Sequence, residues 1–209
     1  MTEKHQIEQN YDKIITKSFR NCLSVYREWQ RTQENINNII SATKGLVNRF
    51  SLLETLDNGD MNTKALSLGV LSDHREVIPI VQQKLLDDID NNYLLMLDTL
   101  SRIKYLIIDK LEKICIENEP YWYQLGLSNQ IILSDMVKVT ASDLIMFCND
   151  IYKMIREEYW RQQNIILKYK TSSFKDKELF FEQLSANSSN SFIDFSYIEY
   201  ILQISHNIK

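Results

Sequence analysis

Two acidic stretches carry the side chains best suited to chemistry in this chain of 209 residues. The first is Leu85-Leu-Asp-Asp-Ile-Asp90, which supplies three carboxylates to one predicted helix. The second is Asn149-Asp-Ile-Tyr-Lys-Met-Ile-Arg-Glu157, which supplies others to a later predicted helix. Carboxylates that face one another across two helices can hold Mg²⁺. The spacing therefore raises the hypothesis of a metal-dependent enzyme.

The two acidic stretches resemble the paired magnesium-diphosphate motifs of terpene synthases, but with three departures. Lys153 stands where that family has Ser or Thr, Asn91 replaces the final Asp of the first motif, and the chain is short for that fold. The three histidines stand apart without the spacing of metal ligands, and no G-x-S-x-G, P-loop or GxGxxG occurs. We therefore expect the acidic stretches to be solvated helix faces, and we predict no catalytic, cofactor-binding or metal-binding residue.

Composition favours long helices in a chain that lies outside membranes. Hydrophobic residues make up 44%, but only four Gly and two Pro are available for turns. A net charge of −4 argues against a broad nucleic-acid surface. The three cysteines, Cys22, Cys115 and Cys148, are far apart and predict buried, reduced thiols. No apolar run approaches the length of a membrane span, and the polar N-terminus predicts no signal peptide, so we expect a soluble, intracellular protein.

Three long helices are predicted from apolar residues that alternate three and four apart. The first covers about residues 11–56, and two polar residues, Gln33 and Thr43, interrupt its seam. Such residues can fix register, but we expect these two at a solvent-open part of the bundle. The expected seam is Ile15, Phe19, Cys22, Tyr26, Trp29, Gln33, Ile36, Ile40, Thr43, Val47 and Phe50.

The second helix is predicted over 77–117, after a loop at 57–75, and should end at Glu119-Pro120 because proline disfavours helix in the residue before it. Its alternation has one stutter between Ile107 and Leu111. The third is predicted from a capping box at Thr140 and Asp143 to about Lys170. Its apolar face is Leu144, Phe147/Cys148, Ile151, Ile155, Tyr159, Gln162 and Ile165/Ile166.

A short helix at 174–184, a polar linker at 187–191 and a final amphipathic helix complete the prediction. Ser191 and Asp194 repeat the capping-box pattern before that helix, whose apolar face is Phe192, Phe195, Ile198, Ile201/Leu202 and Ile204/Ser205. No strand is expected. The predicted fold is all-α, an elongated antiparallel helical bundle, with residues 1–173 as a three-helix bundle and 174–209 as short helices packed on or beside it.

The most aromatic patch is Tyr121-Trp-Tyr-Gln-Leu-Gly-Leu127. Its Trp and Tyr side chains are of the kinds that dominate interaction surfaces. The patch can equally be a loop tucked over the end of the bundle, and both interpretations stay open.

The third helix also carries a family resemblance. Asp143-Leu-Ile-Met-Phe-Cys-Asn-Asp-Ile, followed by Arg156-Glu-Glu-Tyr159-Trp-Arg, resembles the ungapped pattern of the AIRIM family of AAA+ ATPase-interacting ribosome maturation factors. Leu125-Gly-Leu-Ser128, the Trp29-Gln30 region and the segment from Phe192 to Ser205 are similar to that family in the same order. Residues 57–75 and 174–191 depart from it.

The resemblance implies a non-catalytic adaptor without a cofactor. It would pair with a CINP-like helical protein, sit on Afg/Drg-type AAA+ ATPases, and act in large-subunit (pre-60S) ribosome maturation in the cytoplasm and in replication-fork proteostasis in the nucleus. The alternative is a structural coiled-coil subunit of a tether or kinetochore-type complex. The hypothetical partner-binding residues are Trp29, Tyr121, Trp122, Tyr123, Asp143, Asp150, Arg156 and Tyr159.

Overall fold

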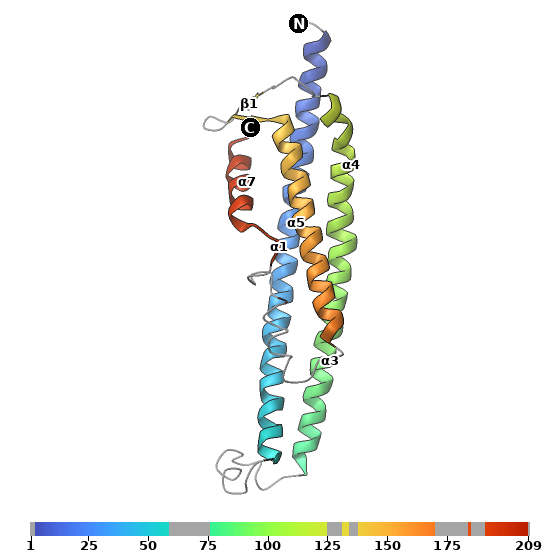
Figure 1. Cartoon of the computed structure of the whole chain (residues 1–209), viewed down its shortest axis with the longest axis vertical. Coiled ribbons are helices and arrows are strands. Elements are labelled where there is room, and N and C mark those ends of the chain that lie inside the picture. The colour runs from blue at the N-terminus through green and yellow to red at the C-terminus, as the bar shows by residue number, and fades with distance from the viewer. Residues whose placement is uncertain are drawn as a thin grey trace. The chain divides into compact units, whose positions relative to one another are not determined.

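The computed structural model describes residues 3–58, 76–124, 131–133, 138–169, 184 and 191–208, and these are predominantly helical (Figure 1). The predicted all-α class, with long helices packed against each other and a short C-terminal helix, is confirmed. No helix within these ranges is long and apolar enough to cross a membrane. The elements are α1 (Glu3–Asn58), α3 (Val77–Ile103), η2 (Lys104–Ile108), α4 (Asp109–Gln124), β1 (Ile131–Leu133), β2 (Lys138–Thr140), α5 (Ala141–Tyr169) and α7 (Phe195–Asn207).

Several sequence predictions fall on residues outside those ranges. They are the loop at 57–75 beyond Asn58, the helix at 174–184 apart from Leu184, the linker before Ser191, and the part of the aromatic patch that follows Gln124. The side chain of Tyr123 also lies outside the description.

The chain divides into two compact units. Residues 1–33, 101–162 and 189–209 form the first unit, and residues 34–100 and 163–188 form the second. The long helices α1 and α5 each contribute to both units, whereas the sequence prediction placed a boundary at residue 173. α7 belongs to the first unit.

Every residue of the predicted seam of α1 is buried, from Ile15 to Phe50. The spacing of three and four therefore located the buried face of a helix of 56 residues. The expectation that Gln33 and Thr43 face solvent is wrong, since their exposed fractions are 5% and 0%. Thr43 satisfies its hydroxyl on its own helix by donating to the Ile39 carbonyl at 2.7 Å.

In the first unit α1 and α5 run parallel and α4 runs against both. The Phe19 ring lies 6.2 Å from that of Phe147, and further along both helices Gln33 is bonded to Gln162. Against α4 the order is reversed, because Tyr11 contacts Tyr121 whereas Glu28, later in α1, pairs with Lys110, earlier in α4. Along α5 the same reversal is seen, since Cys148 contacts Cys115 and the later Tyr152 contacts the earlier Glu112. The antiparallel prediction therefore holds for α4 against α1 and α5, while α1 and α5 share one direction.

The stutter predicted between Ile107 and Leu111 coincides with a π-helical turn, η2, which follows α3 and precedes α4 without a break. The Asp109 amide donates to the Lys104 carbonyl, five residues back, which takes one more residue into the turn than an α-helix does. That extra residue keeps Ile103, Ile107 and Leu111 on the same buried face. A sequence irregularity thus has a direct backbone counterpart.

α4 continues through Pro120 to Gln124, so the predicted stop at Glu119-Pro120 is wrong. Proline removes one helical donor and disfavours the α-conformation in the preceding residue, but packing can override that preference. The last turn is held here by Tyr121, whose ring lies 5.3 Å from the Tyr11 ring of α1.

α5 begins as its sequence predicted. The Thr140 amide donates to Asp143 Oδ2 at 2.8 Å, and the Asp143 amide donates to Thr140 Oγ1 at 3.1 Å, which is a capping box. Thr140 also ends β2, which pairs antiparallel with β1, opposite Ile131. The expectation of no strand is wrong for this small pair, because three-residue strands are too short for an alternating pattern.

The second unit has its own apolar contacts. Phe50 and Leu53 of α1 pack with Leu85 of α3, and the Tyr93 ring stacks on that of Tyr169 at 5.0 Å. Burial raises the pKa of the Tyr169 hydroxyl above its usual range. These contacts join α1, α3 and the end of α5 within this unit.

Candidate interaction site

Two of the hypothetical partner-binding residues are buried in the first unit. Trp29 is 2% exposed and stacks on Tyr26 at 5.6 Å, and Tyr159 is 4% exposed with its ring against Trp160. Their side chains stabilise the core and offer no surface to a partner. The neighbouring Trp160 is half exposed.

Asp143 and Asp150 bind other parts of this chain. Asp143 closes the capping box of α5, and Asp150 Oδ2 accepts a hydrogen bond of 2.6 Å from the Tyr197 hydroxyl of α7. Burial raises the pKa of Tyr197 above its usual range, and its bond to Asp150 adds to the shift. Asp150 therefore contacts a different helix, α7, through its side chain.

The ring of Phe147 in α5 contacts aromatic rings of both α1 and α7. Its ring lies 6.2 Å from each of the rings of Phe19, Tyr197 and Tyr200, in a tilted contact with the first and edge contacts with the other two. Two of the residues that carry the family resemblance, Phe147 and Asp150, therefore contact α7 and help to hold it against α5. Arg156 differs, since its exposed guanidinium lies over the Tyr152 ring at 5.2 Å.

The capping box predicted at Ser191 is replaced by other bonds. Asp194 is the N-cap of α7 and accepts from the Tyr197 amide at 3.0 Å. Phe192 and Phe195, expected on the apolar face, are 51% and 44% exposed, whereas Ile198, Ile201 and Ile204 are buried. The apolar face of α7 is therefore narrower than predicted.

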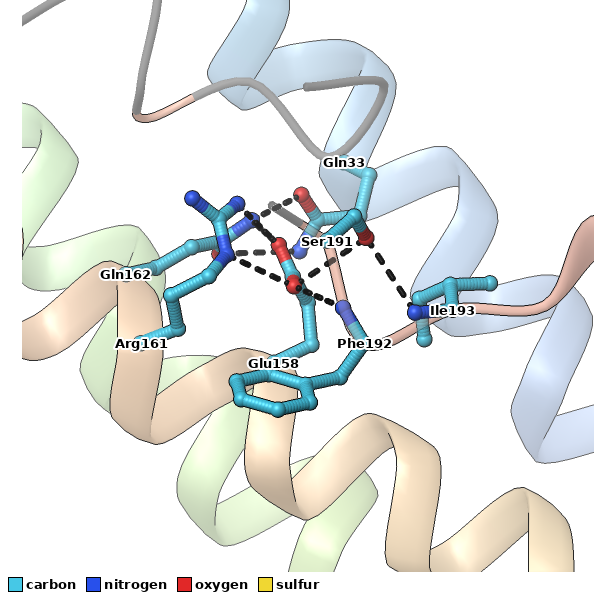
Figure 2. Close-up of polar contacts among 7 residues, drawn as sticks. All are labelled: Gln33, Glu158, Arg161, Gln162, Ser191, Phe192 and Ile193. Carbon is cyan, nitrogen blue, oxygen red and sulfur yellow. Dashed lines mark hydrogen bonds and ion pairs between the residues drawn. The ribbon is translucent and has the colours of Figure 1, made fainter. Parts of the chain in front are cut away.

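A buried carboxylate, Glu158 of α5, organises the segment that leads into α7 (Figure 2). Its side chain is fully buried and forms an ion pair with Arg161 one turn later. Glu158 Oε2 also accepts from the Ser191 hydroxyl and the Phe192 amide, each at 3.1 Å, and Oε1 accepts from Gln162 at 2.8 Å. Five donors from two segments thus stabilise one buried charge.

The network extends to α1 through a pair of amides. Gln33 Nε2 donates to Gln162 Oε1 at 3.2 Å, and Gln162 Nε2 donates back to Gln33 Oε1 at 2.9 Å. Buried amides bonded in this reciprocal way fix one register between two helices. Sequence reasoning placed Gln33 on the seam, and the structure supplies its partner.

The chemistry first considered for the acidic stretches finds no support in the described part of the chain. No group of three His, Cys, Asp or Glu side chains there is placed to hold a metal ion. Cys22, Cys115 and Cys148 are not joined in disulfides. Burial raises the pKa of Cys115 to about 12, and a hydrogen bond with Cys148 together with burial raises that of Cys22, so neither forms a reactive thiolate at neutral pH.

A pocket of about 310 Å³ between α4 and α5 is the candidate interaction site. Its floor has the buried Ile145 and the half-buried Cys115, while Ile116 and Trp122 are 60% and 46% exposed at its edge. Glu119 adds an exposed carboxylate and completes the lining with Asn149. This set, termed the α4–α5 pocket, combines an apolar interior with one negative charge.

Of the hypothetical partner-binding residues, Trp122 lies at the α4–α5 pocket, and Tyr121 is half-buried beside it in sequence. The aromatic patch is thus divided, with Tyr121 packed against α1 and Trp122 turned to the surface. Ile116 and Glu119 were missed, although Ile116, Glu119 and Trp122 follow one another at spacings of three, which could have indicated a shared helix face.

The fold and the pocket define a helical protein with a largely apolar pocket on one of its units. Comparison with known proteins adds no relative, since no protein-family model and no curated protein matches the chain.

Proposed function

We propose that the chain is a non-catalytic adaptor that holds a helical partner in the α4–α5 pocket. The observation that carries this proposal is the exposed pair Ile116 and Trp122 beside a buried apolar floor. Exposed Trp beside a pocket is typical of interaction hot spots. A pocket of this size accommodates an apolar side chain of a partner rather than a whole helix.

The charge at the pocket favours a basic partner segment. The two lysines of α4 are bonded elsewhere, Lys110 to Glu28 at 3.2 Å and Lys113 to Glu117 at 3.9 Å. Glu119 lies at the pocket with its carboxylate exposed. The expected occupant is therefore an amphipathic helix that inserts Leu or Phe and places Lys or Arg one turn away, against Glu119.

The resemblance of α5 to the AIRIM family extends this proposal to a particular assembly. In it the chain pairs with a CINP-like protein, sits on an Afg/Drg-type AAA+ ATPase and serves pre-60S maturation. Support comes from the α5 pattern between Asp143 and Tyr159. The alternative is a structural coiled-coil subunit without an ATPase.

Affinity purification of the tagged full chain followed by mass spectrometry tests both the adaptor role and the proposed ATPase assembly. Recovery of AAA+ ATPases with pre-60S proteins supports the adaptor, and recovery of helical partners without any ATPase contradicts it. W122A and E119K should each reduce recovery of the pocket's partner at least about tenfold, because hot-spot truncations cost about 2 kcal/mol or more.

The matched control is W160A, which removes another half-exposed tryptophan of the same unit. It should leave partner recovery unchanged if the pocket is the docking site. Equal losses from W122A and W160A would overturn the pocket as the site, and unfolding of W122A, seen by circular dichroism, would assign Trp122 to the core.

A further inference from the structure

The hydroxyl of Ser191 occupies an unusual position, at the surface but bonded to a buried charge. Ser191 is half-buried, and its Oγ donates to Glu158 Oε2 at 3.1 Å while accepting from the Ile193 amide at 3.2 Å (Figure 2). Ser191 lies four residues before the start of α7 at Phe195, so this bond anchors the segment that leads into that helix.

We propose that Ser191 is a phosphorylation site and that its phosphorylation releases α7 from α5. A protein kinase would transfer the γ-phosphoryl group of ATP to Ser191 Oγ. The new O–P bond forms as the bond to the β–γ bridging oxygen breaks, ADP leaves, and the hydroxyl proton passes to the base of the kinase. The inference does not depend on the adaptor function.

The residue three positions after Ser191 indicates which kind of kinase would act. Asp194 is exposed and places a carboxylate at that position, with one oxygen accepting from the Tyr197 amide at the start of α7. A kinase whose substrate cleft carries Lys or Arg side chains for a downstream acid fits this arrangement.

The electrostatics of the Glu158 site explain why the modification would release the helix. At present Glu158 and Arg161 neutralise one another, and Arg161 Nε and Nη2 both already donate to Glu158. A phosphoserine carries a charge of about −1.5 to −2 and no donor in place of the hydroxyl. It would therefore lose the bond to Glu158 and set a second negative charge beside a carboxylate that is fully buried.

Release would weaken a coherent set of contacts. The hydrogen bond from the Phe192 amide to Glu158 is next to Ser191 in the chain. The hydrogen bond from Tyr197 to Asp150 lies in the first turn of α7, where that helix packs on α5. Ile198, Ile201 and Ile204 would then become exposed together, since all three are now buried. The released α7 would present an apolar stripe at spacing three.

The test treats the full chain with ATP and an acid-directed kinase, maps phosphate by mass spectrometry, and measures amide hydrogen exchange. We expect phosphate on Ser191 and at least about tenfold faster exchange in α7, because the modification removes the hydrogen bond of Ser191 to a buried carboxylate. Exchange in α3 should stay unchanged, which shows that the fold is retained.

Two variants separate release from a general effect of charge. S191E should speed α7 exchange, whereas S196E, which puts the same charge at an exposed position of α7, should not. Adding E158Q to S191E should restore part of the protection, because the repelling charge is removed. The proposal is overturned if Ser191 stays unmodified while other residues react, if α7 keeps or gains protection, or if S191E and S196E act alike.

Discussion

The Tyr197 hydroxyl of α7 donates a hydrogen bond of 2.6 Å to the Asp150 carboxylate of α5. The same tyrosine ring meets Phe147 edge-on, so one residue supplies both a polar and an apolar contact between the two helices. α7 has 13 residues and an isolated helix of that length is marginal in water. Its order must therefore come from this docking.

Replacing Tyr197 with Phe should destabilise the docking of α7 by about 1 kcal/mol, because the ring stays but the bond to a half-buried carboxylate is lost. Amide exchange in α7 should rise about fivefold, with the helices α1 and α5 little affected. The control is Y200F, which removes a hydroxyl from the other α7 ring that contacts Phe147. Equal effects of the two variants would show that the Asp150 bond is not what holds α7.

Alkaline pH should act on the same bond. The folded pKa of Tyr197 is raised by burial and by Asp150, so its stabilising contribution is complete below the unfolded pKa of about 10. It is lost as pH rises through the folded pKa, because the unfolded chain releases the proton first. Denaturant unfolding of the wild type should lose more stability above about pH 10 than that of Y197F. Parallel curves for the two proteins would contradict the shift.

Glu158 should be the most sensitive charged position described. E158A removes the fully buried carboxylate that pairs with Arg161 and accepts hydrogen bonds from Ser191 and Phe192, so we expect a loss of about 3 kcal/mol or more in unfolding free energy. E158Q keeps some of the bonds and should cost less. The double variant E158A/R161A should cost less than the two single changes combined, as chemical denaturation in a double-mutant cycle measures. Simple additivity would mean that the ion pair is not coupled.

Periodicity predicted the buried seams because core residues must recur on one helix face, and Ile15 to Phe50 follow that rule without exception. Gln33 and Thr43 lie on the same seam, and their polarity led to the wrong expectation that they face solvent. Their burial depends on a bond to Gln162, distant in sequence, and on a carbonyl of the same helix. Neither partner is visible from local polarity.

The Glu158 network and the α4–α5 pocket were each predictable only in part. Glu158 lies three residues after Ile155 and four before Gln162, which is the spacing of the buried seam, so its burial had a sequence signal that its charge obscured. Trp122 was singled out as an aromatic residue, but its exposure depends on a helix that continues through Pro120. Which side of that helix faces α5 follows from tertiary packing alone.

The π-turn η2 supports a last prediction, because it holds one residue more than an α-helical turn. Deleting Tyr105, which is 64% exposed in η2, should convert the turn to α-helix and restore the alternation of four and three at Ile103, Ile107 and Leu111. The melting temperature should change by only a few degrees. Deleting the exposed Asn91 from the regular part of α3 should be far more harmful, since it turns the following seam residues out of the core. Thermal unfolding followed by circular dichroism measures both, and equal losses would show that η2 does not compensate for the stutter.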